Sequence, residues 1–270
     1  MQGRDLGAVA KEVQKAVDDI RPKLPRGAQV LVSPITDPGT LSAIILQGLV
    51  PRLVDTAPGS YNTSAAEIAK RLTPEVKAIC LVHAAGESAD IEAVADLAAN
   101  RGIPLVEDDV YGELHGGAHR PLPAKAFDQA GLVLHCSSFS KCLAPGYRVG
   151  WAAAGRYTAQ VQRLKMMSTL ATSLPAQRAV ADYLAHGGYD RHLRQLRQAL
   201  SAQRQRAARQ IARHFPAGTR VTHPEGGYFL WLELPAGVDA LALSQDALAQ
   251  GISTAPGVLF SADQRFVHHL

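Results

Sequence analysis

Short apolar runs alternate with helix-length amphipathic stretches through the first half of the chain. The stretches at 40–48, 64–72 and 90–101 have helical periodicity. Strands joined by helices need crossover connections, so they form a parallel sheet with both faces covered. We therefore predict an α/β fold built on a three-layer, mainly parallel sheet. Its strands are expected at 29–32, 50–55, 77–82, 103–107, 132–136 and 149–154.

The pattern changes after Pro216, which predicts a second and smaller unit. Helical stretches at 156–169, 175–186 and 189–214 are followed by short strand-like and helix-like segments, a pattern that indicates a partial α+β domain. We predict an N-terminal helix (5–20) and linker over 1–28, a large domain over 29–190, and a connecting helix with a truncated small domain over 191–270. The segments of the small domain are strands near 219–222, 228–234 and 252–255 and a helix near 239–250.

Composition places the chain among ordinary globular proteins. A hydrophobic fraction of 47% can bury a large core, and no apolar run reaches the roughly 18 residues of a membrane span. The three cysteines, Cys80, Cys136 and Cys142, form no CxxC pair, so we expect reduced thiols and a cytoplasmic protein. His115 and His119 flank two glycines, which favours a loop over a helical metal pair, and we predict no metal site.

Much of the positive charge lies in one stretch, from Arg191 to Arg213. A basic face can bind nucleic acid. The arginines alternate with Leu193, Leu196 and Leu200 at helical spacing, so a long amphipathic helix with a solvated basic face is the simpler interpretation. No helix-turn-helix pattern or zinc-finger spacing supports nucleic-acid binding.

We expect three segments to carry the chemistry, each just past the carboxyl end of a parallel strand, where open α/β sheets bind ligands. In the first, Glu107 to Tyr111, both Asp108 and Tyr111 can point into one site. Paired acids after a strand could instead bind a metal or cap the next helix. This motif alone leaves those alternatives open.

The second segment, Cys136 to Trp151, places a lysine among small hydroxyl residues after an apolar strand. Ser138, Ser140 and Arg148 suit a phosphate, because hydroxyls and a forked guanidinium are strong donors to phosphate oxygens. A lysine beside a phosphate site and removed from water has reason to be nucleophilic. We therefore expect Lys141 to be the reactive group.

The third segment, Pro224 to Pro235, has two glycines before an alternating aromatic strand. This pattern fits a tight turn and a close backbone approach. By itself it indicates only a strand.

These motifs resemble those of the fold-type I, pyridoxal-5'-phosphate (PLP)-dependent aminotransferases of class I/II. The similarity is greatest to the aminotransferase-like domain of MocR-type (GntR-family) regulators and to aminoadipate-type transaminases. It is densest over 104–155, where Ser-Phe-Ser-Lys at 138–141 precedes Pro-Gly-Tyr-Arg-Val-Gly-Trp at 145–151. The segments 226–231 and 255–260 also match the small domain of that family.

The resemblance implies a role for each matched residue. Lys141 would be the catalytic residue, forming a Schiff base with PLP and then moving protons. Asp108 would pair with the pyridine nitrogen, and Tyr111 would hydrogen-bond the ring hydroxyl. The phosphate would be held by Ser138, Ser140 and Arg148. The resemblance also implies a homodimer that acts on amino acids and 2-oxo acids.

Four departures from the family pattern lead us to expect a chain that is incomplete at both ends. No Gly/Ser-rich phosphate-binding segment precedes Val30, and the segment Ser33 to Thr36 lacks the aromatic residue that stacks on the PLP ring. The family's Asn-Pro-x-Gly segment is replaced by His83 to Ser88. The chain stops at Leu270, before the family's substrate-carboxylate arginine. It also lacks the DNA-binding winged helix of MocR regulators.

Three functional hypotheses follow. In the first, the chain is an aminotransferase that binds PLP through Lys141. In the second, it is a non-catalytic domain, or a fragment, of a MocR-type regulator that senses PLP or an amino-acid effector. In the third, it is a truncated chain that folds poorly, because the loss of the family's last strand and helix would expose apolar surface.

Overall fold

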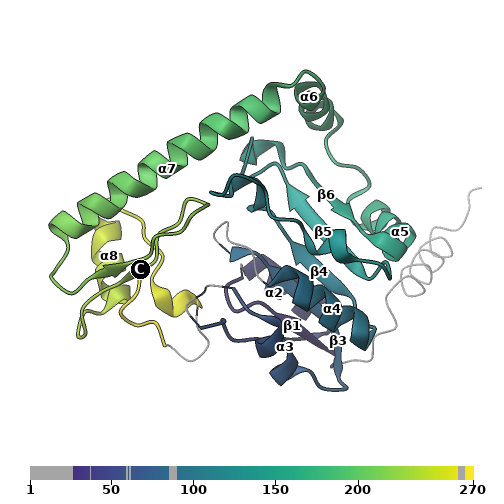
Figure 1. The fold of residues 1–270 in the computed structure, drawn as a ribbon, viewed down its shortest axis with the longest axis horizontal. Helices are drawn as coiled ribbons and strands as arrows, with labels where there is room; N and C mark the ends of the chain where they lie inside the picture. The colour runs from purple at the N-terminus through teal and green to yellow at the C-terminus, as the bar shows by residue number, and fades with distance from the viewer. Residues whose placement is uncertain (1–26, 37, 59, 61, 85–89, 261–264) are drawn as a thin grey trace, which may run out of the picture.

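The computed structural model describes residues 27–36, 38–58, 60, 62–84, 90–260 and 265–270. Its centre is a six-stranded sheet with the strand order β2-β1-β3-β4-β5-β6 (Figure 1). The first five strands pair in parallel, and β6 pairs antiparallel with β5 at the edge. The predicted α/β class and mainly parallel sheet are confirmed. The strands are β1 (Gln29–Val32), β2 (Val50–Leu53), β3 (Val76–Val82), β4 (Leu105–Asp108), β5 (Val133–Ser138) and β6 (Gly150–Ala153).

Helices cover both faces of this sheet, as the alternating sequence pattern predicts. On one face, α3 (Ala65–Arg71) and α4 (Ile91–Arg101) bury a cluster that includes Leu31, Ile79 and Leu81. On the other face, α2 (Pro38–Leu46) packs on a smaller cluster that includes Val30, Val32, Cys80 and Val82. Neighbouring residues of one strand point to opposite faces, so each strand contributes to both clusters.

Local chemistry sets the ends of these helices. The Ser64 hydroxyl accepts a hydrogen bond from the Glu67 amide at 3.3 Å and caps the start of α3. At the end of α4, Gly102 adopts a left-handed conformation with φ of 62°, which glycine reaches without a side-chain clash. Single-turn helices complete the connections: η2 (Gly112–Leu114), η3 (Ala124–Phe127), η4 (Pro145–Tyr147), η5 (Gly155–Tyr157) and η6 (Gly257–Phe260).

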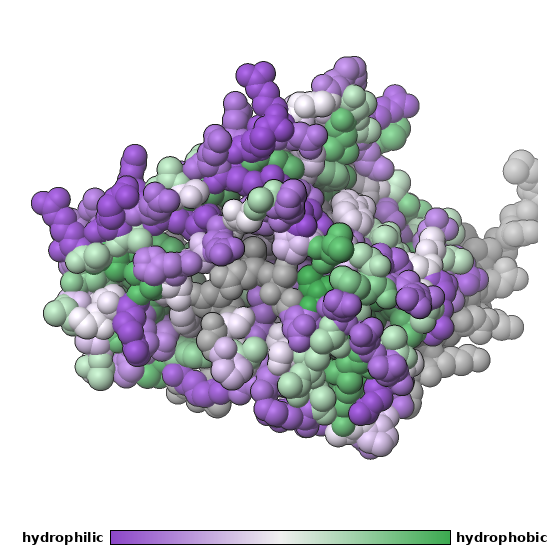
Figure 2. All heavy atoms as spheres, in the orientation of Figure 1, coloured by the Kyte–Doolittle hydropathy of each residue, from purple (hydrophilic) through white to green (hydrophobic). Residues whose placement is uncertain are grey.

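A long helix leads from the large sheet to the second unit. After α5 (Thr158–Thr169) and α6 (Leu174–Ala185), α7 runs unbroken over Gly188–His214. Its 27 residues give a length of about 40 Å. It spans the upper edge of the molecule in Figure 1, and Figure 2 shows hydrophilic side chains along that edge. The second unit consists of β7 (Arg220–Val221), β8 (Leu232–Glu233) and α8 (Ala240–Ala249).

Three predictions about the second unit are wrong. Residues 252–255 form no strand because their contacts are local: Ile252 N bonds Ala247 O, and the Thr254 and Ser244 hydroxyls bond each other at 2.9 Å. The strand expected at 228–234 is limited to 232–233. The segment 224–235 does not follow a parallel strand, since it lies after β7 in an antiparallel pair. The helix predicted at 5–20 lies outside the described residues.

Within the described ranges, no helix combines the length and apolarity needed to cross a membrane. The same ranges hold no group of three or more His, Cys, Asp or Glu side chains placed to bind a metal ion. The three cysteines are free thiols.

Candidate functional site

The predicted site residues lie at the carboxyl edge of the sheet and in the turn that follows it. Asp108 ends β4, where its Cα pairs with Val82 of β3 and Cys136 of β5. The Ser137 hydroxyl donates to the Asp109 carbonyl at 2.9 Å and fixes the end of β4 to β5. The next residues of β5 lead directly into the turn that carries Lys141.

The structure brings the three predicted phosphate ligands together. Arg148 donates from Nη1 to the Ser140 hydroxyl at 3.3 Å, and the Ser138 hydroxyl accepts from the Ser140 amide at 3.4 Å. Arg148 adopts a left-handed conformation, with φ of 52°, at the end of η4. A side chain at Gly150 would place its Cβ 2.9 Å from the Ser137 carbonyl oxygen, so this close hairpin requires glycine there.

Lys141 lies beside Tyr111, with Nζ 5.5 Å from the centre of the tyrosine ring. The expectation that this lysine is removed from water is wrong, since the side chain is exposed in the structure. The reason is that it projects from the turn between β5 and β6, at the edge of the sheet. The backbone beneath it is anchored, because Cys142 is buried with Leu114 and Leu193, and His192 of α7 bonds the Cys142 carbonyl at 2.8 Å.

Three aromatic rings form a group next to Lys141, and we call Tyr111, Tyr228 and Phe229 the aromatic group. The Tyr111 ring meets Tyr228 at 5.7 Å and Phe229 at 5.8 Å between centroids, both edge to face. Tyr228 and Phe229 are 38% and 46% exposed, so part of this apolar surface is open to a ligand. Sequence reasoning found Tyr111 but missed the other two, which it assigned only to a strand.

Close backbone contacts hold the loop that carries Tyr228 and Phe229. The Gly227 amide donates to the Leu114 carbonyl at 2.8 Å, and Arg204 of α7 donates to the carbonyls of Gly227 and Glu225. A Cβ at Gly116 would clash with the Glu225 backbone. The close approach predicted for Gly226–Gly227 is therefore present, and it joins the second unit to the loop after β4.

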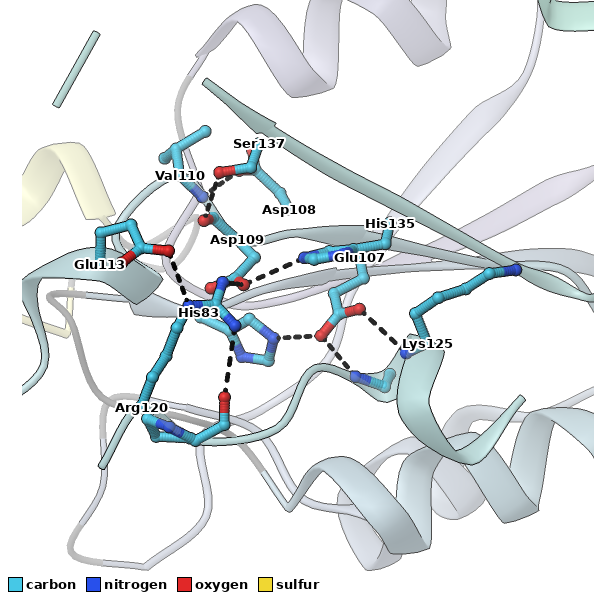
Figure 3. A network of polar contacts seen from close by, with 12 residues as sticks. His83, Glu107, Asp108, Asp109, Val110, Glu113, Arg120, Lys125, His135 and Ser137 are labelled. Carbon is cyan, nitrogen blue, oxygen red and sulfur yellow. Dashed lines mark hydrogen bonds and ion pairs between the residues drawn. The ribbon is translucent and has the colours of Figure 1, made fainter. Parts of the chain in front are cut away.

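A buried polar network lies beneath the site (Figure 3). Glu107 is fully buried; its Oε1 bonds His83 Nε2 at 2.9 Å and the Ala124 amide at 2.7 Å, while Oε2 accepts from the Lys125 amide at 3.4 Å. Glu107 and Asp108 point to opposite faces because side chains alternate along β4. Sequence reasoning missed this network, and its signal was a glutamate inside an otherwise apolar run.

A second carboxylate, Asp109, connects this region to β6. Asp109 Oδ2 lies 2.5 Å from Arg120 Nη2 and 3.0 Å from His135 Nε2 (Figure 3). The His135 ring meets the Trp151 ring of β6 edge to face, with 4.9 Å between the centroids. Burial favours the neutral acid and would raise the pKa of Asp109. The His135 hydrogen bond and the Arg120 charge outweigh burial and hold the pKa below its ordinary value.

Asp109→Asn is expected to reduce the acid sensitivity of the fold. Because the folded-state pKa is lower than the unfolded value, ionised Asp109 stabilises the protein above about pH 4, and this stabilisation is lost as the pH falls through the folded pKa. The variant should lose about 1–3 kcal/mol at pH 7, and its deficit should shrink below about pH 4. Urea unfolding across this pH range would measure it.

The control is Asp246→Asn, because Asp246 is exposed on α8. An Asp109→Asn deficit that stayed constant with pH would contradict the assigned linkage.

The sequence of this chain is similar to those of known aminotransferases and transcriptional regulators. Residues 16–116 match the DegT/DnrJ/EryC1/StrS aminotransferase family. The HTH-type transcriptional regulator YdcR of Escherichia coli is 53% identical over 164 residues, which cover 61% of this chain and 35% of that protein. Aromatic-amino-acid aminotransferase 1 of Thermococcus litoralis is 33% identical over 168 residues, which cover 62% of this chain and 40% of that enzyme. The match thus spans well under half of either relative.

Solved structures match nearly the whole chain. LysN, the alpha-aminoadipate aminotransferase of Thermus thermophilus, complexed with N-(5'-phosphopyridoxyl)-L-leucine, matches with 26% identity and a TM-score of 0.78, over 97% of this chain and 68% of that one. The kynurenine aminotransferase of Pyrococcus horikoshii, in complex with PMP, has the same identity and TM-score, over 96% and 67%. The predicted architecture and resemblance are both confirmed by these matches.

Proposed function

Because this chain is an aminotransferase-like protein with the fold of the PLP-dependent aminotransferases, we propose that it binds PLP and transfers an amino group between an amino acid and a 2-oxo acid. The turn between β5 and β6 carries this proposal. It carries Lys141 directly after Ser140, whose hydroxyl accepts from the Arg148 guanidinium and whose amide donates to the Ser138 hydroxyl. This donor set fits PLP, whose aldehyde requires an amine and whose phosphate requires hydrogen-bond donors.

Each of the proposed site residues would contact a particular group of PLP or of the substrate. Ser138, Ser140 and Arg148 would bind the phosphate, since Arg148 can form two parallel bonds to its oxygens. Asp108 would hold a proton on the pyridine nitrogen, and Tyr111 would orient the ring through its hydroxyl. Bound PLP supplies an electron sink for negative charge developing at the substrate α-carbon. Lys141 would hold the cofactor and, once released by substrate, move a proton at that carbon.

We further propose that the PLP-binding domain spans 29–190 and that the connecting helix and small domain span 191–270. The protein would act in the cytoplasm as a homodimer.

The aromatic group favours substrates with large apolar or aromatic side chains. Tyr228 and Phe229 lie against Tyr111, which itself lies under the Lys141 amine. A side chain on a substrate held at Lys141 would meet these partly exposed rings and bury apolar area against them. The acidic side chain of a substrate such as aspartate would gain no comparable burial of apolar area against these rings.

Replacing both Tyr228 and Phe229 with alanine is expected to lower kcat/KM for phenylalanine by about 10-fold or more, the scale of one lost apolar pocket contact. The kcat/KM for aspartate should change little. The measurement is 2-oxo acid release from each amino acid by the PLP-loaded protein with a 2-oxo acid acceptor.

The control is Tyr183→Ala, which removes an exposed ring on α6. Equal losses for phenylalanine and aspartate would contradict the assigned preference. If the unaltered protein released no 2-oxo acid from any amino acid, the transfer reaction itself would be rejected.

The similarity to the regulator YdcR favours a second candidate function, in which the chain senses an amino-acid effector through bound PLP without turnover. A change in the PLP absorbance spectrum on adding amino acid, with no 2-oxo acid released, would support sensing. Continuous release of 2-oxo acid would support the aminotransferase.

A further inference from the structure

The arginines of α7 divide into two sets with different surroundings. Arg197 faces the large sheet, where Nε donates to the Glu113 carbonyl at 2.7 Å. Arg204 faces the second unit, where Nη2 donates to the Glu225 carbonyl at 2.8 Å. These two residues are half-buried and tie the helix to both parts of the molecule. Their roles are structural.

The other five arginines are exposed to solvent. None of their side chains forms a hydrogen bond or ion pair with any residue in the part of the chain that the structure describes. At about 100° per residue, all five fall within an arc of about 120°, and Arg197 and Arg204 lie outside this arc, about 120° and 140° from its middle. We call these residues the arginine face: Arg191, Arg194, Arg206, Arg209 and Arg213.

The arginine face has a single sign of charge. The helix has one acidic residue, Asp190 in its first turn, and none between 191 and 214. Arg206, Arg209 and Arg213 follow one another at spacings of three and four, where like charges repel on a helix. A surface that serves solubility alone mixes both signs. This one concentrates positive charge, and Figure 2 shows the hydrophilic edge that results.

The linear shape of the arginine face indicates what kind of molecule would bind it. The five arginines span about 33 Å along a straight helix. Duplex DNA is a similarly linear polyanion, with one negative charge per about 1.7 Å of axis, and arginine pairs with phosphate through two parallel bonds. The residues between the arginines, such as Gln195, Gln198 and Gln205, are exposed donors and offer no aromatic platform for unpaired bases.

We propose that the arginine face binds the phosphate backbone of duplex DNA without reading its base sequence. This binding needs no winged helix in the chain. It is also independent of PLP, because among the described residues no side chain of the face forms a hydrogen bond or ion pair with Lys141 or Arg148.

The test is the affinity of the full chain for a short fluorescent DNA duplex of arbitrary sequence, measured by anisotropy over a range of KCl concentrations. If all five arginines contact phosphates, the slope of log affinity against log salt is about −4.5. Arg206→Gln with Arg209→Gln should weaken binding and make the slope shallower by about 2. The corresponding double lysine variant should keep most of the slope.

The matched control is Arg163→Gln with Arg178→Gln, which removes the same charge from exposed positions on α5 and α6. If this control weakened binding as much, net charge alone would explain it and the proposal would be overturned. Absence of DNA binding at low salt would also overturn it. So would tighter, arginine-face-dependent binding to anionic phospholipid vesicles, which would identify a membrane instead. Lys141→Ala should leave DNA affinity unchanged, so failure of the PLP site and failure of this proposal are separable.

Discussion

Lys141→Ala will eliminate the visible absorbance band of lysine-linked PLP and reduce amino-group transfer by about 1,000-fold or more. The reason is that one side chain would both hold the cofactor and move the proton, and positioned general acid–base groups alone contribute about 10²–10⁴-fold. The variant should fold normally, because Lys141 is exposed and buries no apolar contact. The measurement is the absorbance spectrum after PLP is added and free cofactor is removed.

The matched control is Lys165→Ala, at an exposed position on α5. It should retain both the band and the activity of the parent. A Lys141→Ala protein with an unchanged band would show that PLP reacts with another amine and would reject the assigned lysine. A parent protein with no band, although well folded, would reject PLP binding itself.

Glu107→Ala will destabilise the fold by about 3–5 kcal/mol, the cost of removing one partner from a buried polar network. The side chain is fully buried and bonds His83 and the amides of Ala124 and Lys125. Alanine would remove the carboxylate oxygens to which all three groups bond. Glu107→Gln keeps one carbonyl oxygen, so its cost should be about half. Urea unfolding followed by circular dichroism measures both.

Glu92→Ala provides the comparison, since Glu92 is exposed in the first turn of α4. It should change stability by no more than about 0.5 kcal/mol. A Glu107→Ala cost as small as that would mean that water replaces the carboxylate, and the network would not be a structural anchor.

The sequence predicted the large sheet well because its strands and helices have different periods. All six strands were located to within about two residues of their observed bounds, and β4 places Asp108 at the expected edge. The short strands of the second unit were predicted poorly. Their pairing depends on distant segments, such as the bridge between Glu233 and His269, and local propensity says little about such contacts.

The site was predicted in part for the same reason. Ser138, Ser140, Lys141 and Arg148 lie within one hairpin, so a local motif identified them together. Tyr228 and Phe229 come from more than 80 residues further along the chain, and only the fold brings them against Tyr111, the ring beneath the Lys141 amine. The exposure of Lys141 could not be predicted from the sequence either, because the residues around a turn do not reveal which elements pack over it.

The single helix α7 contacts three loops that lie far apart along the chain. Its first turns bury Leu193 against Cys142, its middle holds Glu113 through Arg197, and two turns further Arg204 holds the loop of Tyr228 and Phe229. A straight helix cannot shift one of these contacts without displacing the others. The turn that carries Lys141 and the aromatic group therefore move together, and loosening α7 at any point would separate the proposed reactive amine from the surface proposed to bind the substrate side chain.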